Sequence, residues 1–260
     1  MGTVSWRMAL ARVALGTLAL AATPMEAIAQ APAVDPAATR ILKRMTDYVG
    51  SLKQFSVHTQ IDLEDLLVTG QRIDEDIAAS VTVSRPNKLR AERRGGLVDQ
   101  AFYYDGKTLT LYNGSANVYA TEPAPKSVPE LLDYTREKLG LVMPVSDLVY
   151  PNAYALLMQD VTFAALIGKS VIGRMKCDHL LFSRPGVDFQ VWVAESGPPL
   201  PCKYVVTDRA NPGWMSISTV MSDWNVAPDV ADARFTFVPP KGAKQITFLP
   251  LEASGSTTPR

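Results

Sequence analysis

One strand-like segment, Cys177-Asp178-His179, holds the residues best suited to chemistry. A histidine beside a thiol or a carboxylate can serve as a general base or activate a nucleophile. Neighbours in a strand point to opposite faces, so Asp178 is poorly placed to orient His179, whereas Cys177 shares its face. A hydrolase that uses His179 with Cys177 or Asp178 is therefore an alternative. The simpler interpretation is a hydrogen-bonded histidine in a sheet, and we assign no catalytic residue and expect no enzyme.

Other catalytic and cofactor signals are weak. Gly168-Lys169-Ser170 resembles the end of a phosphate-binding loop, but Phe163 occupies the position of the required earlier glycine. No G-x-S-x-G nucleophile elbow is present. The two histidines, His58 and His179, have no carboxylate at metal-ligand spacing. We expect neither a metal nor a cofactor.

The two cysteines, Cys177 and Cys202, lie in strand-like segments with one further strand between them. Three strands side by side would put the outer two about 10 Å apart, and a disulfide reaches about 7 Å. A bridge therefore requires the middle strand to end early or the sheet to bend. In an oxidising compartment a disulfide is favoured, and the alternative is two small buried residues.

The N-terminus has the features of a cleavable export signal. Arg7 and Arg12 flank the uncharged stretch 13–22, and Ala27-Ile28-Ala29 supplies small residues for cleavage. The apolar stretch is too short for a bilayer, which takes about 20 residues. We expect a signal peptide over 1–29, cut after Ala29 or Ala31, with an uncleaved anchor helix as the alternative. No cysteine follows the cut, so we expect no lipid-modified N-terminus.

The charge balance argues against a nucleic-acid partner. The chain has 26 Lys and Arg and 26 Asp and Glu, and losing Arg7, Arg12 and Glu26 with the signal leaves a net charge of about −1. We expect an exported, periplasmic monomer whose contact with a membrane is at most transient.

Two β-rich regions flank a helical one. Asp35 and Pro36 predict a helix start, with Gly50 as its end. The alternation of apolar and polar residues then predicts strands over 55–64, 77–84, 89–93, 100–104, 108–112 and 117–121. Ser127 and Glu130 form a capping box, so we expect a helical insertion over about 123–160. Strands resume over 163–167, 170–182, 188–194, 202–207, 215–224 and 235–238. Residues 30–250 are expected to form one domain, and 251–260 a disordered tail.

Three motifs resemble the LolA-like periplasmic lipoprotein carriers. They are the R-P strand start in 84–90, the D-G-K-T-L hairpin in 104–113, and the F-x-F-x-P-P-x-G segment in 235–242. Segments 177–180 and 188–192 further resemble one branch, the predicted periplasmic proteins of DUF2092. The resemblance implies an unclosed antiparallel β-barrel of about eleven strands, mainly β with α, whose helices cover an apolar cavity. The longer helical insertion and the cysteine pair are differences from the carriers. They weaken the case for a lipoprotein as the ligand.

The resemblance also implies a role for Arg85. In the carriers, the arginine of the R-P motif hydrogen-bonds the helical lid and helps to hold it shut, and Arg85 matches that position. The alternative is an arginine that ends a strand in solvent.

We expect a carrier or binding protein for a lipid, lipoprotein or other hydrophobic ligand. The alternatives are the hydrolase and an envelope-stress sensor or scaffold that binds envelope proteins. Apolar burial stabilises by about 25 cal/mol per Å², so an acyl chain can replace core side chains on a concave sheet face. The candidates for that face are Phe102, Leu109, Leu111, Leu181, Val191, Val193, Tyr204, Val206 and Ile217.

Overall fold

The computed structural model describes residues 33–140, 143, 145–211 and 213–248. The expected signal peptide, 1–29, and the expected tail, 251–260, lie outside the described residues. No described helix is long and apolar enough to cross a membrane.

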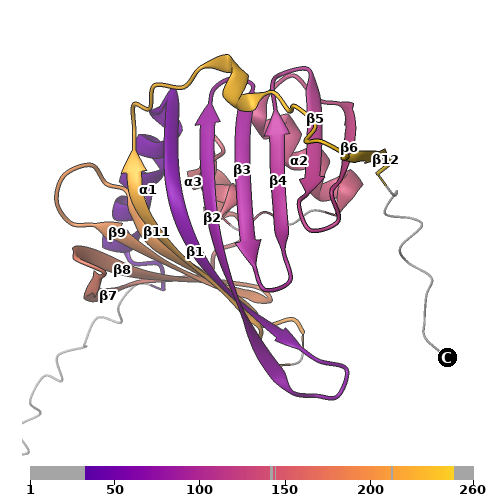
Figure 1. Cartoon of the computed structure of the whole chain (residues 1–260). Helices are drawn as coiled ribbons and strands as arrows, with labels where there is room; N and C mark the ends of the chain where they lie inside the picture. Colours follow the sequence, from indigo (N-terminus) through magenta and orange to yellow (C-terminus); the bar gives the residue numbers. More distant parts are fainter. Residues whose placement is uncertain (1–32, 141–142, 144, 212, 249–260) are drawn as a thin grey trace, which may run out of the picture. The chain divides into compact units, whose positions relative to one another are not determined.

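A twelve-stranded, strongly curved sheet forms the body of the described part of the chain (Figure 1). The strand order is β12-β6-β5-β4-β3-β2-β1-β11-β10-β9-β8-β7, and the two edge strands do not pair with each other. All neighbours are antiparallel except β12 and β6. The strands are β1 Gln54–Leu66, β2 Arg72–Ser84, β3 Lys88–Gly95, β4 Asp99–Tyr104, β5 Thr108–Asn113, β6 Val118–Pro123, β7 Phe163–Ile172, β8 Met175–Arg184, β9 Val187–Ala194, β10 Pro201–Asp208, β11 Ser216–Asn225 and β12 Lys244–Ile246. The predicted fold class, an unclosed antiparallel barrel with helices, is confirmed.

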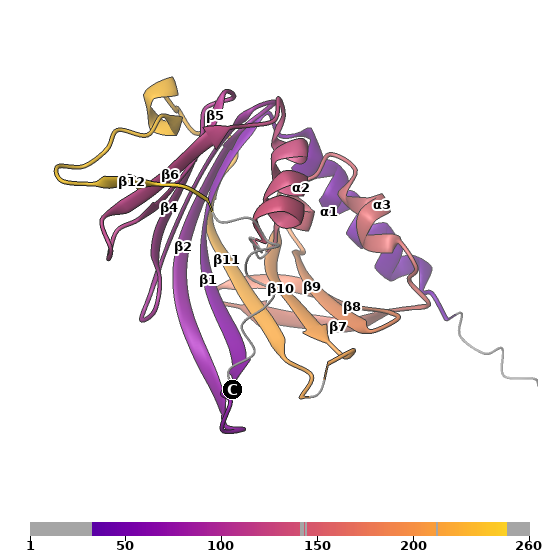
Figure 2. The same cartoon turned by 90° about the vertical axis from the view of Figure 1, so that its right-hand side faces the viewer.

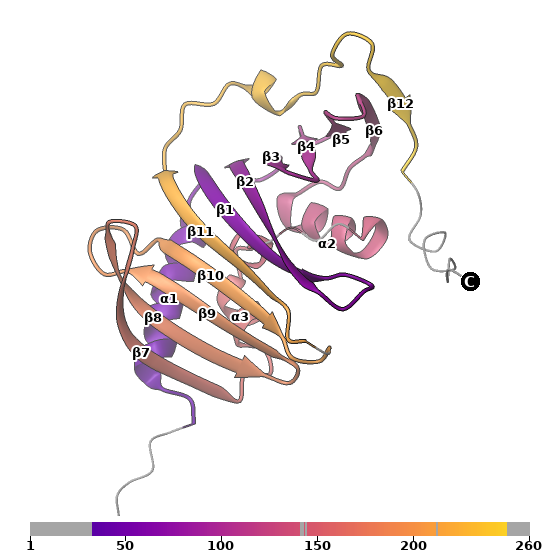
Figure 3. The same ribbon diagram turned by 60° about the horizontal axis from the view of Figure 1, so that its bottom comes forward.

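Three helices cover the concave face of this sheet (Figure 2). They are α1 Pro36–Ser51, α2 Val128–Leu139 and α3 Ala153–Met158, and the short 3-10 helix η1 Ser146–Leu148 lies with them. A second 3-10 helix, η2 Asp232–Phe235, lies on the other face of the sheet against β3 (Figure 2). Seen from below, β7 to β10 curl around α1, which packs on β7, β8 and β9 (Figure 3). The buried side chains between helices and sheet form the main hydrophobic core.

Local sequence explains where the first two helices begin. The Asp35 side chain accepts a hydrogen bond from the Ala37 amide at 2.7 Å, which caps α1 as predicted. Ser127 caps α2 by accepting from the Glu130 amide, and Gly140 ends it in a left-handed conformation with φ of 62°.

The predicted end of α1 at Gly50 is wrong, because the helix continues to Ser51 and Leu52 is its C-cap. Gly50 instead lets two segments approach closely. A Cβ at this position would lie 3.1 Å from the carbonyl oxygen of Pro151. The glycine therefore serves the packing of α1 against the chain that leads into α3.

Two predicted strands are placed differently. The strand over 170–182 is wrong, since the chain turns at Gly173, where φ is 59°, and β7 and β8 form a hairpin instead. The strand over 235–238 is also wrong. Phe235 ends η2 as a buried residue, and the last strand is β12. Phe237 packs its ring against Tyr103, Tyr112 and Tyr119 on the outer face of the sheet.

Candidate functional site

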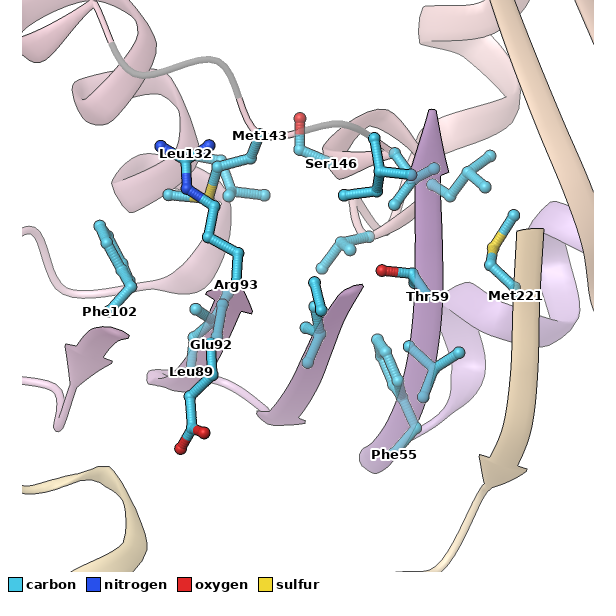
Figure 4. A pocket seen from close by; sticks show the side chains of 18 of the residues that line it. Phe55, Thr59, Leu89, Glu92, Arg93, Phe102, Leu132, Met143, Ser146 and Met221 are labelled. Carbon is cyan, nitrogen blue, oxygen red and sulfur yellow. The ribbon is translucent and has the colours of Figure 1, made fainter. Parts of the chain in front are cut away.

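An apolar pocket of about 120 Å³ lies between the concave face of the sheet and the helices above it. Its floor comes from β1 to β5 and β11, and its roof from α1, α2 and the chain around η1. Figure 4 shows side chains from both layers converging on one space. The lining residues include Phe55, Val57, Ile61, Val81, Phe102, Leu111, Leu132, Met143, Leu148 and Met221.

The floor follows from strand alternation. Every second residue of β1 faces inward, and these residues are Phe55, Val57, Thr59 and Ile61. Their partners on β2 include the small Ala79 and the inward-facing Val81. Small side chains on a concave face leave a space that the neighbouring side chains do not fill.

A second pocket of about 220 Å³ lies beside the first. The two share Leu132, Met143, Val145 and Ser146, so this part of the roof separates them. The second pocket is more polar, because Arg136 and Asp147 join its lining. Burial raises the pKa of the Tyr204 hydroxyl at its floor above the ordinary value, so this phenol stays neutral.

Arg85 lies at the junction of the sheet and its helical cover, which we define as α2 with residues 145–158. The guanidinium Nε donates to the Leu52 carbonyl oxygen at 3.0 Å, and one Nη donates to the carbonyl oxygens of Val49 at 3.5 Å and Val149 at 2.7 Å. The following residue, Pro86, accepts from the Val128 amide at 2.8 Å. The Arg85-Pro86 pair thus touches the end of α1, the chain after η1 and the start of α2.

The charge of Arg85 has no carboxylate within 4.0 Å among the described residues. Burial lowers the pKa of the guanidinium, and its other Nη is buried without a hydrogen-bond partner in the described chain. Backbone carbonyls that end helical turns are therefore its principal compensation. If the cover moved away, the Arg85 guanidinium would be exposed to solvent.

Two tyrosines fix the cover at other points. Tyr134 of α2 donates to the Glu122 carboxylate on β6 at 2.9 Å. Tyr150 donates to the Asp133 carboxylate at 2.7 Å and so joins the chain after η1 to α2. Burial, together with the hydrogen bond to Asp133, raises the pKa of Tyr150 above its ordinary value.

The structure distributes the nine predicted cavity residues over four environments. Two line the first pocket, and three line the second. Three more are fully buried in the core and line neither. Leu181 lies on the opposite face of β8 from the buried Leu180 and Phe182, so its expected place on the concave face is wrong. Phe102 and Leu111 line the first pocket. Tyr204, Val206 and Ile217 line the second. Leu109, Val191 and Val193 are buried in the core.

Cys177 and His179 share the outer face of β8, away from both pockets. The His179 ring stacks on Trp192 with centroids 4.1 Å apart, and its Nε2 shares a hydrogen bond of 2.8 Å with Gln190. Asp178 pairs with Lys169 at 3.4 Å instead of His179. Cys177 has no free thiol to pair with His179, because it is held in a disulfide with Cys202.

The disulfide joins Cys177 and Cys202 across the end of β9. Cys177 pairs in register with Ala194, the last residue of β9, and a register shift interrupts the β9–β10 pairing between Pro201 and Lys203. The middle strand thus ends where the bridge passes. The two sulfurs belong to a small cluster with Trp192 and Ala194 on the outer face.

Sequence reasoning missed three polar residues of the first pocket, Thr59, Arg93 and Gln100. Each lies on the inward face of its strand, and Arg93 donates from Nε to the Gln100 side chain at 2.9 Å. The available signal was the alternation Leu89, Ala91, Arg93, which puts an arginine at an inward-facing position. No group of three or more His, Cys, Asp or Glu residues in the described part of the chain could hold a metal ion.

Comparison with known proteins gives one family. The family model described as a predicted periplasmic protein (DUF2092) matches residues 38–249. No curated protein matches the sequence.

Solved structures of similar chains come from several bacteria. LprF from Mycobacterium bovis is 14% identical with a TM-score of 0.48, over 81% of this chain and 99% of that one. The lipoprotein LppX from Mycobacterium tuberculosis is 16% identical with a TM-score of 0.44, over 76% and 100%. A LolA superfamily protein from Nitrosomonas europaea is 13% identical with a TM-score of 0.34, over 77% and 97%.

Proposed function

Since the chain belongs to DUF2092, a family of predicted periplasmic proteins, we propose that it binds and carries a hydrophobic ligand in the periplasm without catalysing a reaction. The observation that carries this proposal is the apolar first pocket beneath a helical cover. In this proposal residues 1–29 are the export signal.

The volumes of the two pockets imply that the cover must move before an acyl chain can bind. Ligand pockets commonly measure about 300 to 1,000 Å³. The first pocket has about 120 Å³ and the second about 220 Å³, with Leu132, Met143, Val145 and Ser146 between them. An acyl chain would enter when the cover moves away from the sheet and joins the two spaces. The structure described here is then the closed, ligand-free form.

Arg85 acts in this proposal as the latch of the closed form. Its hydrogen bonds reach Val49, Leu52 and Val149, none of which is part of the sheet. Ligand entry must break the bond to Val149, which is a charge-assisted hydrogen bond of 2.7 Å. The latch therefore favours closure both before loading and after release.

Two measurements test the carrier. Native mass spectrometry of gently purified protein should detect co-purified lipid, and a fluorescent fatty acid should bind with a stoichiometry near one. Repeated absence of lipid together with no fluorescent binding would refute the proposal. Turnover of ester or amide substrates that is lost in His179→Ala would instead favour the hydrolase.

A further inference from the structure

We infer that the first pocket takes an amphiphile with an anionic head, which Arg93 binds while the tail lies against the apolar floor. This inference rests on the proposed carrier function and deepens it by naming the class of ligand. It depends on the position of one arginine, its lack of a counter-charge, and an unsatisfied hydroxyl in the same pocket.

Arg93 faces the pocket from the middle of the sheet. In β3 the inward positions are Leu89, Ala91 and Arg93. Glu92 alternates with them and also borders the pocket, but its carboxylate pairs with Arg90. Figure 4 shows the Arg93 side chain extended toward Leu132 and Met143, while the carboxylate of Glu92 points away. An arginine is thus held at the edge of a mainly apolar space, beneath α2.

No carboxylate of the described chain lies within 4.0 Å of the Arg93 guanidinium. Its two neighbours on the outward face differ in this respect, because Arg90 pairs with Glu92 and Arg94 pairs with Asp99. The described partner of Arg93 is the neutral Gln100, whose side-chain oxygen accepts from Nε at 2.9 Å and from one Nη at 2.5 Å. Burial lowers the pKa of Arg93, which is the signature of a cation without local compensation.

The arginine retains donors for a ligand. Gln100 takes Nε and one Nη, and the other Nη makes no hydrogen bond to a described residue. A guanidinium binds carboxylate and phosphate through charge-assisted hydrogen bonds, which are about twice as strong as neutral ones. An anionic head would therefore supply the missing counter-charge at a place from which an apolar tail can reach the pocket.

The space beside Arg93 leads to a second polar group. Arg93 pairs in register with Ala79 of β2, and Ala79 pairs with Thr59 of β1. Two strand spacings put Thr59 about 10 Å from Arg93. Because Ala79 is small, the row between them is open to the pocket that all three residues line.

Thr59 is 5% exposed, and its hydroxyl has no hydrogen-bond partner in the described chain. Figure 4 shows this hydroxyl directed into the pocket. Leaving a buried hydroxyl unpaired destabilises the folded protein. A ligand oxygen a short way along the chain from the head, such as an ester carbonyl or a hydroxyl, would satisfy it. The ligand class is therefore an acyl chain with an acidic head and an oxygen between head and tail.

The test compares two probes with one chain, cis-parinaric acid and its methyl ester, bound to the mature protein at pH 8. The acid should bind about tenfold more tightly than the ester, the effect of one charge-assisted pair. In Arg93→Gln the preference for the acid over the ester should disappear. Arg93→Lys should keep part of the preference.

Arg94→Gln is the matched control, because Arg94 is the next residue on the same strand but faces outward and pairs with Asp99. It should keep the full preference for the acid. Equal affinities of wild type for acid and ester, or a preference that survives in Arg93→Gln, would overturn the inference and leave the carrier intact. Binding of neither probe to wild type would refute the carrier itself.

Competition identifies the head. Hexadecanoic acid and hexadecyl phosphate should both displace the bound probe from wild type more effectively than hexadecanol does. If only one of the two anions displaces the probe more effectively than hexadecanol, the head group is of that kind, carboxylate or phosphate. Equal displacement by the alcohol and both anions would contradict a role for charge.

Discussion

Arg85 and Val149 are joined by a hydrogen bond of 2.7 Å from the guanidinium to a backbone carbonyl oxygen. Arg85 directly follows β2, and Val149 is the residue after η1, so the bond connects the sheet with its helical cover. We therefore expect the position of the cover to depend on a residue that lines neither pocket.

Arg85→Leu should loosen the cover. The change leaves three backbone carbonyls without their donor, which should lower the free energy of unfolding by about 1–3 kcal/mol. Amide exchange in residues 145–158 should become faster, and a fluorescent fatty acid should leave sooner. Arg44→Leu, at an exposed position of α1, serves as the control. Unchanged exchange and unchanged release in Arg85→Leu would remove the latch from the mechanism.

Leu111→Trp should fill the first pocket. Leu111 lies on β5 between Phe102 and Ala120 of the neighbouring strands, and its side chain lines the pocket. The larger ring should reduce binding of parinaric acid methyl ester at least tenfold, while overpacking costs about 1–3 kcal/mol of stability. Leu181→Trp on the outer face is the comparison and should bind normally. Fluorescence titration measures the affinity of both variants. Equal affinities of Leu111→Trp and Leu181→Trp would mean that the ligand does not bind in the first pocket.

Thr59→Val should stabilise the ligand-free protein. It removes a buried hydroxyl that has no partner, so the free energy of unfolding should rise by about 1 kcal/mol. Thr110→Val should do the opposite, because the Thr110 hydroxyl shares a hydrogen bond of 2.8 Å with Thr121. Urea titration measures both. A loss of stability in Thr59→Val would mean that its hydroxyl is satisfied in solution.

Asp62→Asn should change how stability depends on pH. Partial burial, then the charges of Asp74, Asp76 and Glu64, raise the pKa of Asp62, which pairs directly with Asp76 across the β1–β2 hairpin. A raised pKa means that the ionised carboxylate destabilises the folded state at neutral pH. This penalty is lost as pH falls below the unfolded-state pKa of about 3.9.

Wild type should therefore melt below Asp62→Asn at pH 7, and the difference should shrink toward pH 3. Because Asp62 is largely exposed, the difference should be small. Asp65→Asn, near the tip of the same hairpin, is a suitable control. A difference between wild type and Asp62→Asn that grows on acidification would contradict the sign of the shift.

Replacing both cysteines, Cys177→Ala with Cys202→Ala, should lower the free energy of unfolding by about 2–4 kcal/mol, because the unfolded chain gains the freedom of an open loop. The binding of a fluorescent fatty acid should stay within twofold, since the bridge lies on the outer face. Urea titration with and without reductant measures the first effect. A large loss of affinity without unfolding would link the disulfide to the pocket.

Alternation and capping made much of the fold predictable. Asp35, Pro36, Ser127 and Glu130 carry local signals for helix starts, and α1 and α2 begin where these predict. The strand predictions over 170–182 and 235–238 failed because alternation continues through residues that are not in one strand. Val171, Met175 and Cys177 alternate as in a single strand, although Gly173 lies in a hairpin turn. Phe235 and Phe237 also alternate, although Phe235 belongs to a 3-10 helix.

The pocket was harder to predict than the fold. Alternation names the residues of a face, but it cannot tell whether they meet other side chains or a space. Leu109 and Leu111 share a strand face, yet Leu109 is buried in the core and Leu111 lines the pocket. Arg93 was overlooked because β3 contains five charged residues, and charged side chains in a strand ordinarily face solvent. Its inward position became evident only once Gln100 and Ala79 were placed beside it.

The pairing of β1 with β11 brings together the first and last of the long strands, with Leu63 opposite Ile217. These two strands are separated by most of the described chain. Until β11 is in place, β1 keeps one unpaired edge and the centre of the sheet cannot form. We therefore expect this pairing to be a late and slow step of folding, because it joins segments that are far apart in sequence.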